Sequence, residues 1–392
     1  MRILVSADIH LGSPIRSIAL RNPDLSAQLK QASRDTFSDI VDLAISERVD
    51  VLALAGDIFD NQFPDLKSRA FLIAQLARVS DAGIATVLIR GNHDALLDHR
   101  AHGPLGANIH LLQEDQPTVL IGDTAFHGLS FTAAHVDKSL LPAYPQPVPG
   151  KRNVGLMHTS LDGAAGHDPY APCSAADLMA HGFDLWCLGH IHAPFERIDG
   201  PVLAVMPGIP QPRHFGERNG GSVTLVTLTD DAPRFERRTV GHLAFAECAV
   251  DLTSCADQTD VMRCLREALI ALQRQGQSVA VRLHVTSHQY GAEMVAVLAG
   301  EVLEQIDGVY LDKVKSALPA EDRVAETDDF MRLMRAEIAE DGFRQVAAQQ
   351  LEELRLALPR EIADALDPGE LDALLEDALA EVSLTLHGES AQ

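Results

Sequence analysis

Acidic and histidine residues recur at five places in the chain, each directly after an apolar run. The run at residues 51–55 is followed by Gly56 and by two carboxylates, Asp57 and Asp60. Four other stretches share this order of apolar residues, small residue and metal-type ligand: residues 3–10, 86–94, 153–158 and 184–192. An α/β protein builds its sites at the carboxyl ends of its strands. The pattern therefore predicts one site assembled from five strand ends, whereas five unrelated polar turns would not explain the repetition.

The side chains at these strand ends are carboxylates, imidazoles and one amide. The candidate ligands are Asp8, His10, Asp57, Asn92, His158, His190 and His192. Such a set without thiolates suits Mn²⁺, Fe²⁺ or Zn²⁺ better than a structural cysteine-type zinc site or an all-oxygen calcium site. Seven ligands exceed the needs of one catalytic ion. Two ions bridged by a carboxylate are the arrangement that activates water in phosphoester hydrolysis, so phosphoester cleavage is the predicted chemistry.

The local spacing supports a shared site. His190 and His192 are two residues apart on a predicted extended backbone, so their rings point to one side, and Asp8 and His10 have the same spacing. Beside Asn92, which offers a neutral oxygen, His93 can donate or accept a proton. The preceding glycine is expected to let the backbone turn sharply beneath an ion.

Alternating strands and helices must position these residues. Apolar runs predict strands at residues 2–7, 51–55 and 85–89, and helical periodicity predicts helices at 25–48 and 66–82 between them, which gives β-α-β units. Further strands are expected at 118–121, 124–129, 153–158 and 201–206, with an extended stretch at 184–192 and a short helix at 175–181. The remaining histidines of residues 96–150 end no apolar run beside another ligand and are interpreted as structural or surface residues: His102, His110, His127 and His135.

Composition describes an ordinary globular chain of 392 residues, 46% of them hydrophobic, long enough for one large domain and one or two smaller ones. No eighteen apolar residues run together, and the start already looks like a strand, so neither a signal peptide nor a membrane helix is expected. A cytoplasmic location is the expectation. The five cysteines form no Cys-x-x-Cys pair, which argues against a disulfide framework.

The formal net charge of −24 would normally indicate a protein that avoids nucleic acid. The distribution of charge weakens this argument, because more than half of the net negative charge lies in the last part of the chain. Residues 321–392 hold 19 acidic and 6 basic side chains, a net charge of −13, which leaves −11 for the first 320 residues. A carboxylate site is also neutralised by the ions that it binds.

In order, Asp8-x-His10, Gly56-Asp57-x-x-Asp60, Gly91-Asn92-His93-Asp94, Gly155-x-x-His158 and Gly189-His190-x-His192 resemble the full motif set of the calcineurin-like metallophosphoesterases. The resemblance spans residues 1 to about 240. It implies a four-layer α/β/β/α metallophosphoesterase sandwich that holds two divalent metal ions, with Mn²⁺ as the expected metal.

The resemblance also implies roles for individual residues. Asp8, His10, Asp57 and His192 would hold one ion, and Asp57, Asn92, His158 and His190 would hold the other, so that Asp57 bridges the pair. His93 would stabilise the transition state or protonate the leaving oxygen, with Asp60 orienting its ring.

The loop after the last motif indicates a branch of this superfamily. Residues 207–226 run from a Pro-Gly loop into a Gly-begun strand, which is similar to the DNA double-strand-break-repair exonuclease branch, the SbcD-like and YhaO-like proteins. Arg213, His214 and Arg218 could hold a phosphate backbone there or pair with acidic groups, and the same question applies to Arg90. Asn61 stands where protein serine/threonine phosphatases carry arginine, which disfavours that branch.

Three domains are expected: a catalytic domain at residues 1–240, a small α/β cap at 241–316, and an acidic helical tail at 317–392. The resemblance implies that the cap fits DNA duplex ends and that the tail binds the coiled-coil base of an SMC-like ATPase. Packing of the tail leucines on the catalytic domain or in a homodimer would explain the same pattern. The expected function is a metal-dependent DNA exonuclease or endonuclease in DNA repair, and no membrane partner is expected. The alternatives are a small-nucleotide phosphodiesterase or pyrophosphatase and, last, a non-catalytic protein-binding scaffold.

Overall fold

The computed structural model describes residues 1–13, 23–61, 64–97, 106–162, 170–229, 232–317 and 330–357, together with Leu371, Leu375 and Leu379. The chain divides into two compact units. The first unit contains residues 1–248, 265–282 and 299–313, and the second contains 249–264, 283–298 and 314–392. In the described part of the chain, no helix is long and apolar enough to cross a membrane.

Two six-stranded sheets form the body of the first unit. The first sheet has the order β12 (Arg234–Thr239), β11 (Ser222–Thr227), β1 (Arg2–Ser6), β2 (Val51–Ala55), β3 (Ala85–Ile89) and β4 (Ile109–Leu111). The second has the order β5 (Thr118–Ile121), β6 (Thr124–Gly128), β7 (Arg152–His158), β8 (Leu185–Gly189), β10 (Val202–Met206) and β9 (Phe195–Asp199). Strands β1, β2 and β3 are parallel neighbours, and so are β7 and β8. Each set therefore presents its carboxyl ends at one edge of its sheet.

The two sheets pack on each other through alternate side chains of their strands. Ile3 and Val5 of β1 lie in the layer between the sheets, where they join Val154 of β7 and Leu185 of β8, all fully buried. Leu4 points the other way, into the layer beneath the helices. This alternation follows from the two-residue period of a strand, and because both faces are covered the strands read as continuous apolar runs.

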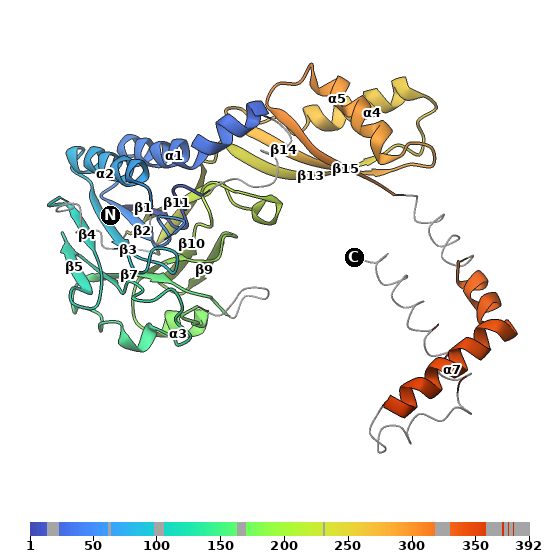
Figure 1. Cartoon of the computed structure of the whole chain (residues 1–392). Coiled ribbons are helices and arrows are strands. Elements are labelled where there is room, and N and C mark those ends of the chain that lie inside the picture. The colour runs from blue at the N-terminus through green and yellow to red at the C-terminus, as the bar shows by residue number, and fades with distance from the viewer. Residues whose placement is uncertain are drawn as a thin grey trace. The chain divides into compact units, whose positions relative to one another are not determined.

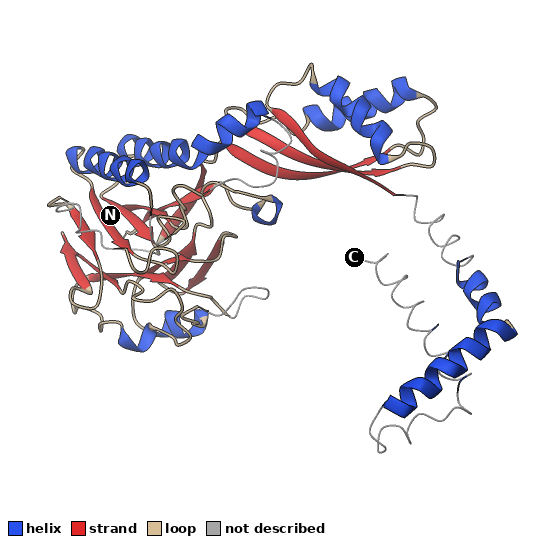
Figure 2. Ribbon diagram, in the orientation of Figure 1, coloured by secondary structure: helices blue, strands red, loops and turns tan. Residues whose placement is uncertain are grey.

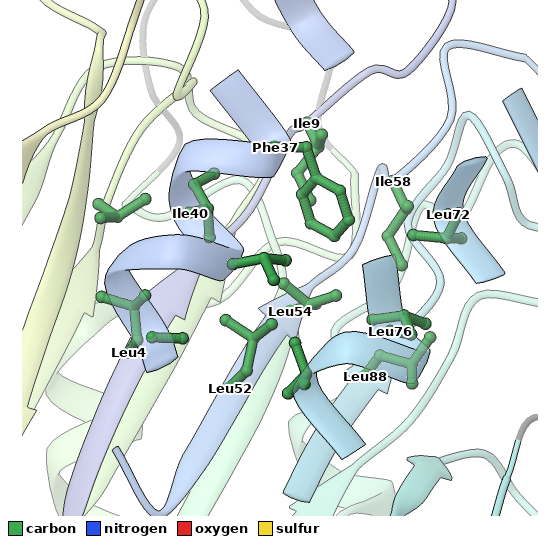
Figure 3. Close-up of a cluster of buried hydrophobic side chains, with 14 of the residues drawn as sticks. Leu4, Ile9, Phe37, Ile40, Leu52, Leu54, Ile58, Leu72, Leu76 and Leu88 are labelled. Carbon is green, nitrogen blue, oxygen red and sulfur yellow. The ribbon is translucent and has the colours of Figure 1, made fainter. Parts of the chain in front are cut away.

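Helices α1 (Pro23–Ser46) and α2 (Leu66–Asp81) cover the outer face of the first sheet (Figure 1). Figure 3 shows Phe37 and Ile40 of α1 in one cluster with Leu4 and Leu52 of the sheet and Leu72 of α2. Burial of each such side chain contributes about 1.5–3 kcal/mol. These contacts hold the helices against the sheet and fix the loops between helix and strand.

A short helix, α3 (Ala175–Ala180), covers the outer face of the second sheet, and the side chain of Ser174 caps its start. Trp186 of β8 is fully buried there, stacks on Phe183 and donates from Nε1 to the backbone oxygen of Leu178. Helices thus flank both sheets, which confirms the predicted four-layer α/β/β/α sandwich (Figure 2). Two single turns of 3₁₀ helix, η1 (Leu141–Ala143) and η2 (Phe215–Glu217), lie in the loops.

The residues after the sandwich form the predicted α/β elements. Strands β13 (Leu243–Asp251), β14 (Ser278–Thr286) and β15 (Val309–Ala317) make a three-stranded sheet, with α4 (Gln258–Ile270) and α5 (Ala292–Leu303) between them in sequence. In the tail, residues 330–338 and α7 (Asp341–Ala357) are helical. Leu371, Leu375 and Leu379 are helical as well, and of the tail residues expected on a helix face only Leu374 and Ala378 lie outside the described residues.

Candidate metal centre

The loops after β1, β2, β3, β7 and β8 bring the predicted site residues together at one end of the sandwich. Asp8, His10, Asp57 and His158 are at most 2% exposed, whereas Asn92, His190 and His192 are partly exposed. Backbone bonds tie the loops to one another: the N–H of Asp8 donates to the oxygen of Gly56, and the N–H of His10 donates to the oxygen of Asp57. All seven candidate ligands therefore face one region.

The carboxylate of Asp57 lies at the middle of this region. Its Oδ1 accepts the backbone N–H of His93 at 2.9 Å, which fixes the side chain. Its Oδ2 lies 3.4 Å from Nε2 of His158 and 3.9 Å from Nε2 of His10. One oxygen is thus oriented by the backbone, and the other faces an imidazole from each ligand group, which is the position that a bridging ligand occupies.

The first ligand group contains Asp8, His10 and His192, whose ligand atoms lie within 4.8 Å of one another. The Nε2 atoms of His10 and His192 are 3.3 Å apart. Nδ1 of His10 lies 3.2 Å from Oδ1 of Asp60, and Nδ1 of His192 lies 2.8 Å from Oε1 of Glu217. Since each carboxylate stabilises a proton on Nδ1, each Nε2 carries a lone pair. Two lone pairs at this separation fit a cation placed between them.

The second ligand group contains Asn92, His158 and His190. Nε2 of His158 lies 3.1 Å from Oδ1 of Asn92, and its Nδ1 lies 3.0 Å from the backbone oxygen of Ala55. The ring of His190 makes an edge contact with the ring of His158, at 5.2 Å between centroids. Nε2 of His158 thus faces oxygen atoms that only accept, and a positive charge stabilises such an arrangement. This donor set also fits a divalent cation.

The backbone of the site is strained at the ligands themselves. Four candidate ligands have a positive φ angle: Asp8 (52°), His10 (47°), Asp57 (51°) and His190 (99°). Each such conformation costs about 1–3 kcal/mol, and it persists only where the surroundings enforce it. Strain of this kind clusters at functional sites, which agrees with a role for these residues beyond packing.

Close approach accounts for two of the motif glycines. A Cβ atom on Gly91 would lie 2.3 Å from Oδ1 of Asp57, and one on Gly189 would lie 2.3 Å from the backbone oxygen of Ala55. Gly91 does not have the positive φ of a sharp turn, so the expected reason for this glycine was wrong. It is needed because the Asp57 carboxylate passes directly over the backbone.

Burial and charge compete in this region. Burial acts to lower the pKa of His158, but the carboxylates of Asp57 and Asp8 outweigh this effect and raise it to about 9. Burial acts to raise the pKa of Asp57, but the charge of His158 holds it below the ordinary range of a carboxyl group. Burial lowers the pKa of His10, which favours the neutral ring that can bind a metal.

His93 lies at the open side of the site, with its side chain 41% exposed. Its Nδ1 lies 2.8 Å from the backbone oxygen of Asp60, and its Nε2 lies 4.0 Å from Oδ2 of Asp57. Asp60 therefore contacts this ring through its main-chain oxygen, and one of its carboxylate oxygens also lies within 4.8 Å of a ring nitrogen of His93. The Asp60 carboxylate lies beside His10 and Arg213.

A family model described as calcineurin-like phosphoesterase matches residues 1–194. Residues 1–194 therefore belong to the calcineurin-like phosphoesterase family. Every candidate ligand lies within this phosphoesterase domain, and the members of the family are hydrolases that use divalent metals.

Relatives of the phosphoesterase domain include two kinds of curated protein. "Uncharacterized metallophosphoesterase YhaO" of Bacillus subtilis is 29% identical over 284 residues, which cover 71% of this chain and 70% of the relative. "DNA double-strand break repair protein Mre11" of Sulfurisphaera tokodaii is 26% identical over 248 residues, which cover 60% of this chain and 62% of the relative. Among solved structures, TT1561 of Thermus thermophilus matches with 14% identity and a TM-score of 0.38, covering 61% of this chain and 98% of that one.

Two acidic residues of the site were not predicted. Asp94 of the phosphoesterase domain is fully buried, and its carboxylate accepts the backbone N–H groups of Gly91 and Ile58. Glu217 lies beyond residue 194 and accepts from His192 and Arg213. The sequence offers one weak signal for Glu217, which is that it stands four residues after Arg213 in the loop that follows the last motif.

The cations proposed to touch phosphate have partners in the structure. Arg213 pairs with Asp60 and Glu217, and Arg218 lies 3.8 Å from Glu247. Arg90 donates from Nη1 to the backbone oxygen of Leu97. His214 is 55% exposed at its side chain, with Nε2 3.3 Å from Oε1 of Glu217.

Proposed function

We propose that this protein is a metal-dependent DNA nuclease that hydrolyses phosphodiester bonds in DNA repair. The observation that carries the proposal is the position of Asp57, whose Oδ2 faces His158 and His10 from separate ligand groups. This arrangement supports a two-ion phosphoesterase centre. The similarity to proteins named for DNA double-strand break repair supports DNA as the substrate.

The first ion would be held by Asp8, His10, Asp57 and His192, and the second by Asp57, Asn92, His158 and His190. When bound, two divalent ions, with Mn²⁺ as the proposed metal, would supply Lewis acidity that lowers the pKa of water and neutralises charge on the phosphate. The surroundings that enforce the strained backbone at Asp8, Asp57 and His190 keep these ligands in place before the substrate arrives.

His93 is proposed as the residue that transfers a proton at the leaving oxygen. Its Nδ1 faces the backbone oxygen of Asp60, and because a carbonyl oxygen only accepts, Nδ1 carries a proton. The exchangeable position is therefore Nε2, on the side of the ring that faces Asp57. The main-chain contact holds the ring so that Nε2 points into the site, and the partial exposure of His93 leaves room for a substrate.

The remaining parts of the chain are proposed to direct the nuclease. Residues 1–240 would form the catalytic domain, and residues 241–316 a cap that fits duplex ends. Residues 317–392 would bind the coiled coil of an SMC-like ATPase, with a homodimer as the alternative partner. Exposed apolar side chains on the tail helices support a docking role: Phe330, Leu333, Phe343 and Val346.

A small-nucleotide phosphodiesterase is the second candidate. The net charge of −24 favours it, because a strongly acidic protein repels a long polyanion more than a small one. A non-catalytic scaffold ranks last, since no position of the ligand set carries a residue that is unable to bind a metal.

The test is degradation of end-labelled linear duplex DNA by the purified chain with Mn²⁺, beside hydrolysis of bis-p-nitrophenyl phosphate. His93→Ala is the active-site variant. The matched control is His242→Ala, because His242 is an exposed histidine that pairs with Asp39 outside the site. Shortening of the duplex by the parent and by His242→Ala, but not by His93→Ala, is the expected result. Ester hydrolysis with intact DNA would favour the small-nucleotide phosphodiesterase.

A further inference from the structure

Both histidines of the first ligand group are backed by a carboxylate on the side away from the site. Asp60 lies behind His10 at 3.2 Å, and Glu217 lies behind His192 at 2.8 Å. A carboxylate in this position fixes the tautomer and the orientation of a metal-binding imidazole. The geometry of the first group therefore depends on what holds the two carboxylates.

A single side chain, Arg213, holds both of them. Its Nη1 donates to Oδ1 of Asp60 at 2.9 Å, and its Nη2 donates to Oε1 of Glu217 at 2.7 Å. Its Nε lies 3.2 and 3.3 Å from the two oxygens of Glu217, and its backbone N–H donates to Oε2 at 2.7 Å. A continuous chain of contacts thus joins His10, Asp60, Arg213, Glu217 and His192.

The three charged side chains at the centre of this chain of contacts are largely buried. Glu217 is 5% exposed, and the side chains of Arg213 and Asp60 are 17% and 19% exposed. Two largely buried carboxylates that face the same side chain would repel one another without a cation between them. The guanidinium is planar and always charged, and its fork of donors can serve both carboxylates at once.

The backbone places Arg213 between loops of different sheets. Asp60 follows β2 of the first sheet, whereas Arg213 and Glu217 lie in the loop that leads from β10 of the second sheet to β11 of the first. That loop returns to His192, because the N–H of Ile209 donates to the His192 oxygen at 3.0 Å. Arg213 therefore connects the two halves of the sandwich beside the first ligand group.

The second ligand group has a different support. The backbone oxygen of Ala55 orients His158, and among the described residues the hydrogen bonds of Arg213 do not reach Asn92 or His158. We propose that Arg213 is a positioning residue which, through Asp60 and Glu217, fixes His10 and His192 and so supports the first ion position but not the second. This inference rests on the proposed two-ion centre. It also implies that the N–H donors of Arg213 bind Asp60 and Glu217, and not the phosphates of DNA.

The test is the binding of Mn²⁺ followed by electron paramagnetic resonance, which needs no turnover. Arg213→Met keeps the aliphatic stem and removes the donors. Loss of such an outer contact typically weakens metal affinity by about 10- to 100-fold. We expect the parent to bind two Mn²⁺ ions and to give the spectrum of a coupled pair. We expect Arg213→Met to bind one ion as tightly as the parent and the other about 10- to 100-fold more weakly, so that the spectrum at limiting Mn²⁺ is that of an uncoupled ion.

Two further variants make the test specific. Glu217→Gln preserves the buried shape while it removes the charge, and it decides the question if Arg213→Met does not fold. Arg213→Lys should recover only part of the affinity, because an ammonium group cannot serve both carboxylates in the same fork geometry. Arg237→Ala is the matched control, because Arg237 pairs with the glutamate Glu196 on the edge strands β12 and β9.

The outcomes separate the inference from the proposed function. The inference is supported if Arg213→Met or Glu217→Gln weakens the binding of one Mn²⁺ ion only, while Arg237→Ala binds both ions as the parent does. The inference is overturned if the binding of both ions weakens equally, or if neither binding affinity changes. A raised KM for DNA with unchanged Mn²⁺ binding would instead identify Arg213 as a phosphate contact. A parent protein that binds no Mn²⁺ would overturn the proposed two-ion centre itself.

Discussion

The carboxylate of Asp94 accepts the backbone N–H of Ile58 at 2.9 Å, across two loops that begin at different strands. Its other oxygen accepts the N–H of Gly91 at 2.8 Å. One buried side chain thus joins the loop that carries Asp57 to the loop that carries Asn92 and His93. Burial and the charge of Asp57 raise the pKa of Asp94 to about 6, which means that the ionised carboxylate is unfavourable at this position. Its two acceptor oxygens, each bound to a backbone N–H of a different loop, explain why the residue is nevertheless present.

Asp94→Ala is expected to destabilise the protein by about 2–6 kcal/mol, because two buried N–H groups lose their acceptors at about 1–3 kcal/mol each. Asp94→Asn should cost less, because its amide keeps one acceptor oxygen. Urea unfolding of the two variants and the parent measures the difference. Equal stability of Asp94→Ala and the parent would show that the two loops hold their geometry without this residue.

Gly155→Ala is expected to destabilise the second sheet. A Cβ at this position would lie 2.4 Å from the ring of Trp186, which is fully buried and cannot withdraw easily. Overpacking of this kind costs about 1–3 kcal/mol or more. Thermal unfolding and the near-ultraviolet circular dichroism of the single tryptophan measure the effect. In Gly300→Ala, the matched control in helix α5, the added methyl group meets nothing within 4 Å, and the helix should gain about 0.5–1 kcal/mol.

Mn²⁺ is expected to stabilise the chain against unfolding, and a chelator to reverse this effect. At an ion concentration about 100 times Kd, one site adds about 2.7 kcal/mol. Asp57→Asn should lose most of this gain, since Asp57 contacts both ligand groups. Asp123→Asn is the control, because Asp123 is an exposed carboxylate paired with Lys151. A thermal shift in the Asp57 variant as large as that of the parent would contradict the bridging role.

His93→Ala is expected to keep the stabilisation by Mn²⁺ and to lose catalysis. Removal of a positioned proton donor typically lowers turnover by about 100- to 10,000-fold. The effect should appear in kcat, with the Mn²⁺ midpoint unchanged, because His93 belongs to neither ligand group in the proposed centre. If ion affinity fell in parallel with turnover, His93 would have to be reassigned as a ligand.

Strand positions could be predicted closely where both faces of a strand are covered. Strands β2 at Val51–Ala55 and β3 at Ala85–Ile89 have the predicted bounds, because their apolar runs end at turn-forming or charged residues. Strands β9 and β12 were not predicted. Both lie at sheet edges, and their sequences, Phe195–Asp199 and Arg234–Thr239, are rich in charged side chains that face solvent.

Within the site, the residue types could be predicted but some contacts could not. The ligand motifs are local, so a few neighbouring residues contain the information. The direction of the Asp60 carboxylate depends on Arg213, which is 153 residues away in the loop that joins β10 of the other sheet to β11. Glu217 belongs to that loop and has no motif of its own. Contacts made across the sandwich therefore required the structure.

The layer of buried side chains between the two sheets has a further consequence. Asp57 comes from one sheet and His158 from the other, and their separation of 3.4 Å is set by how closely Val5, Val154 and their neighbours interdigitate. A methylene added to or removed from this layer would change the sheet spacing and hence the distance between the ion positions. Variants with altered metal preference should therefore arise from apolar substitutions in the interior, at residues that contact neither an ion nor a substrate.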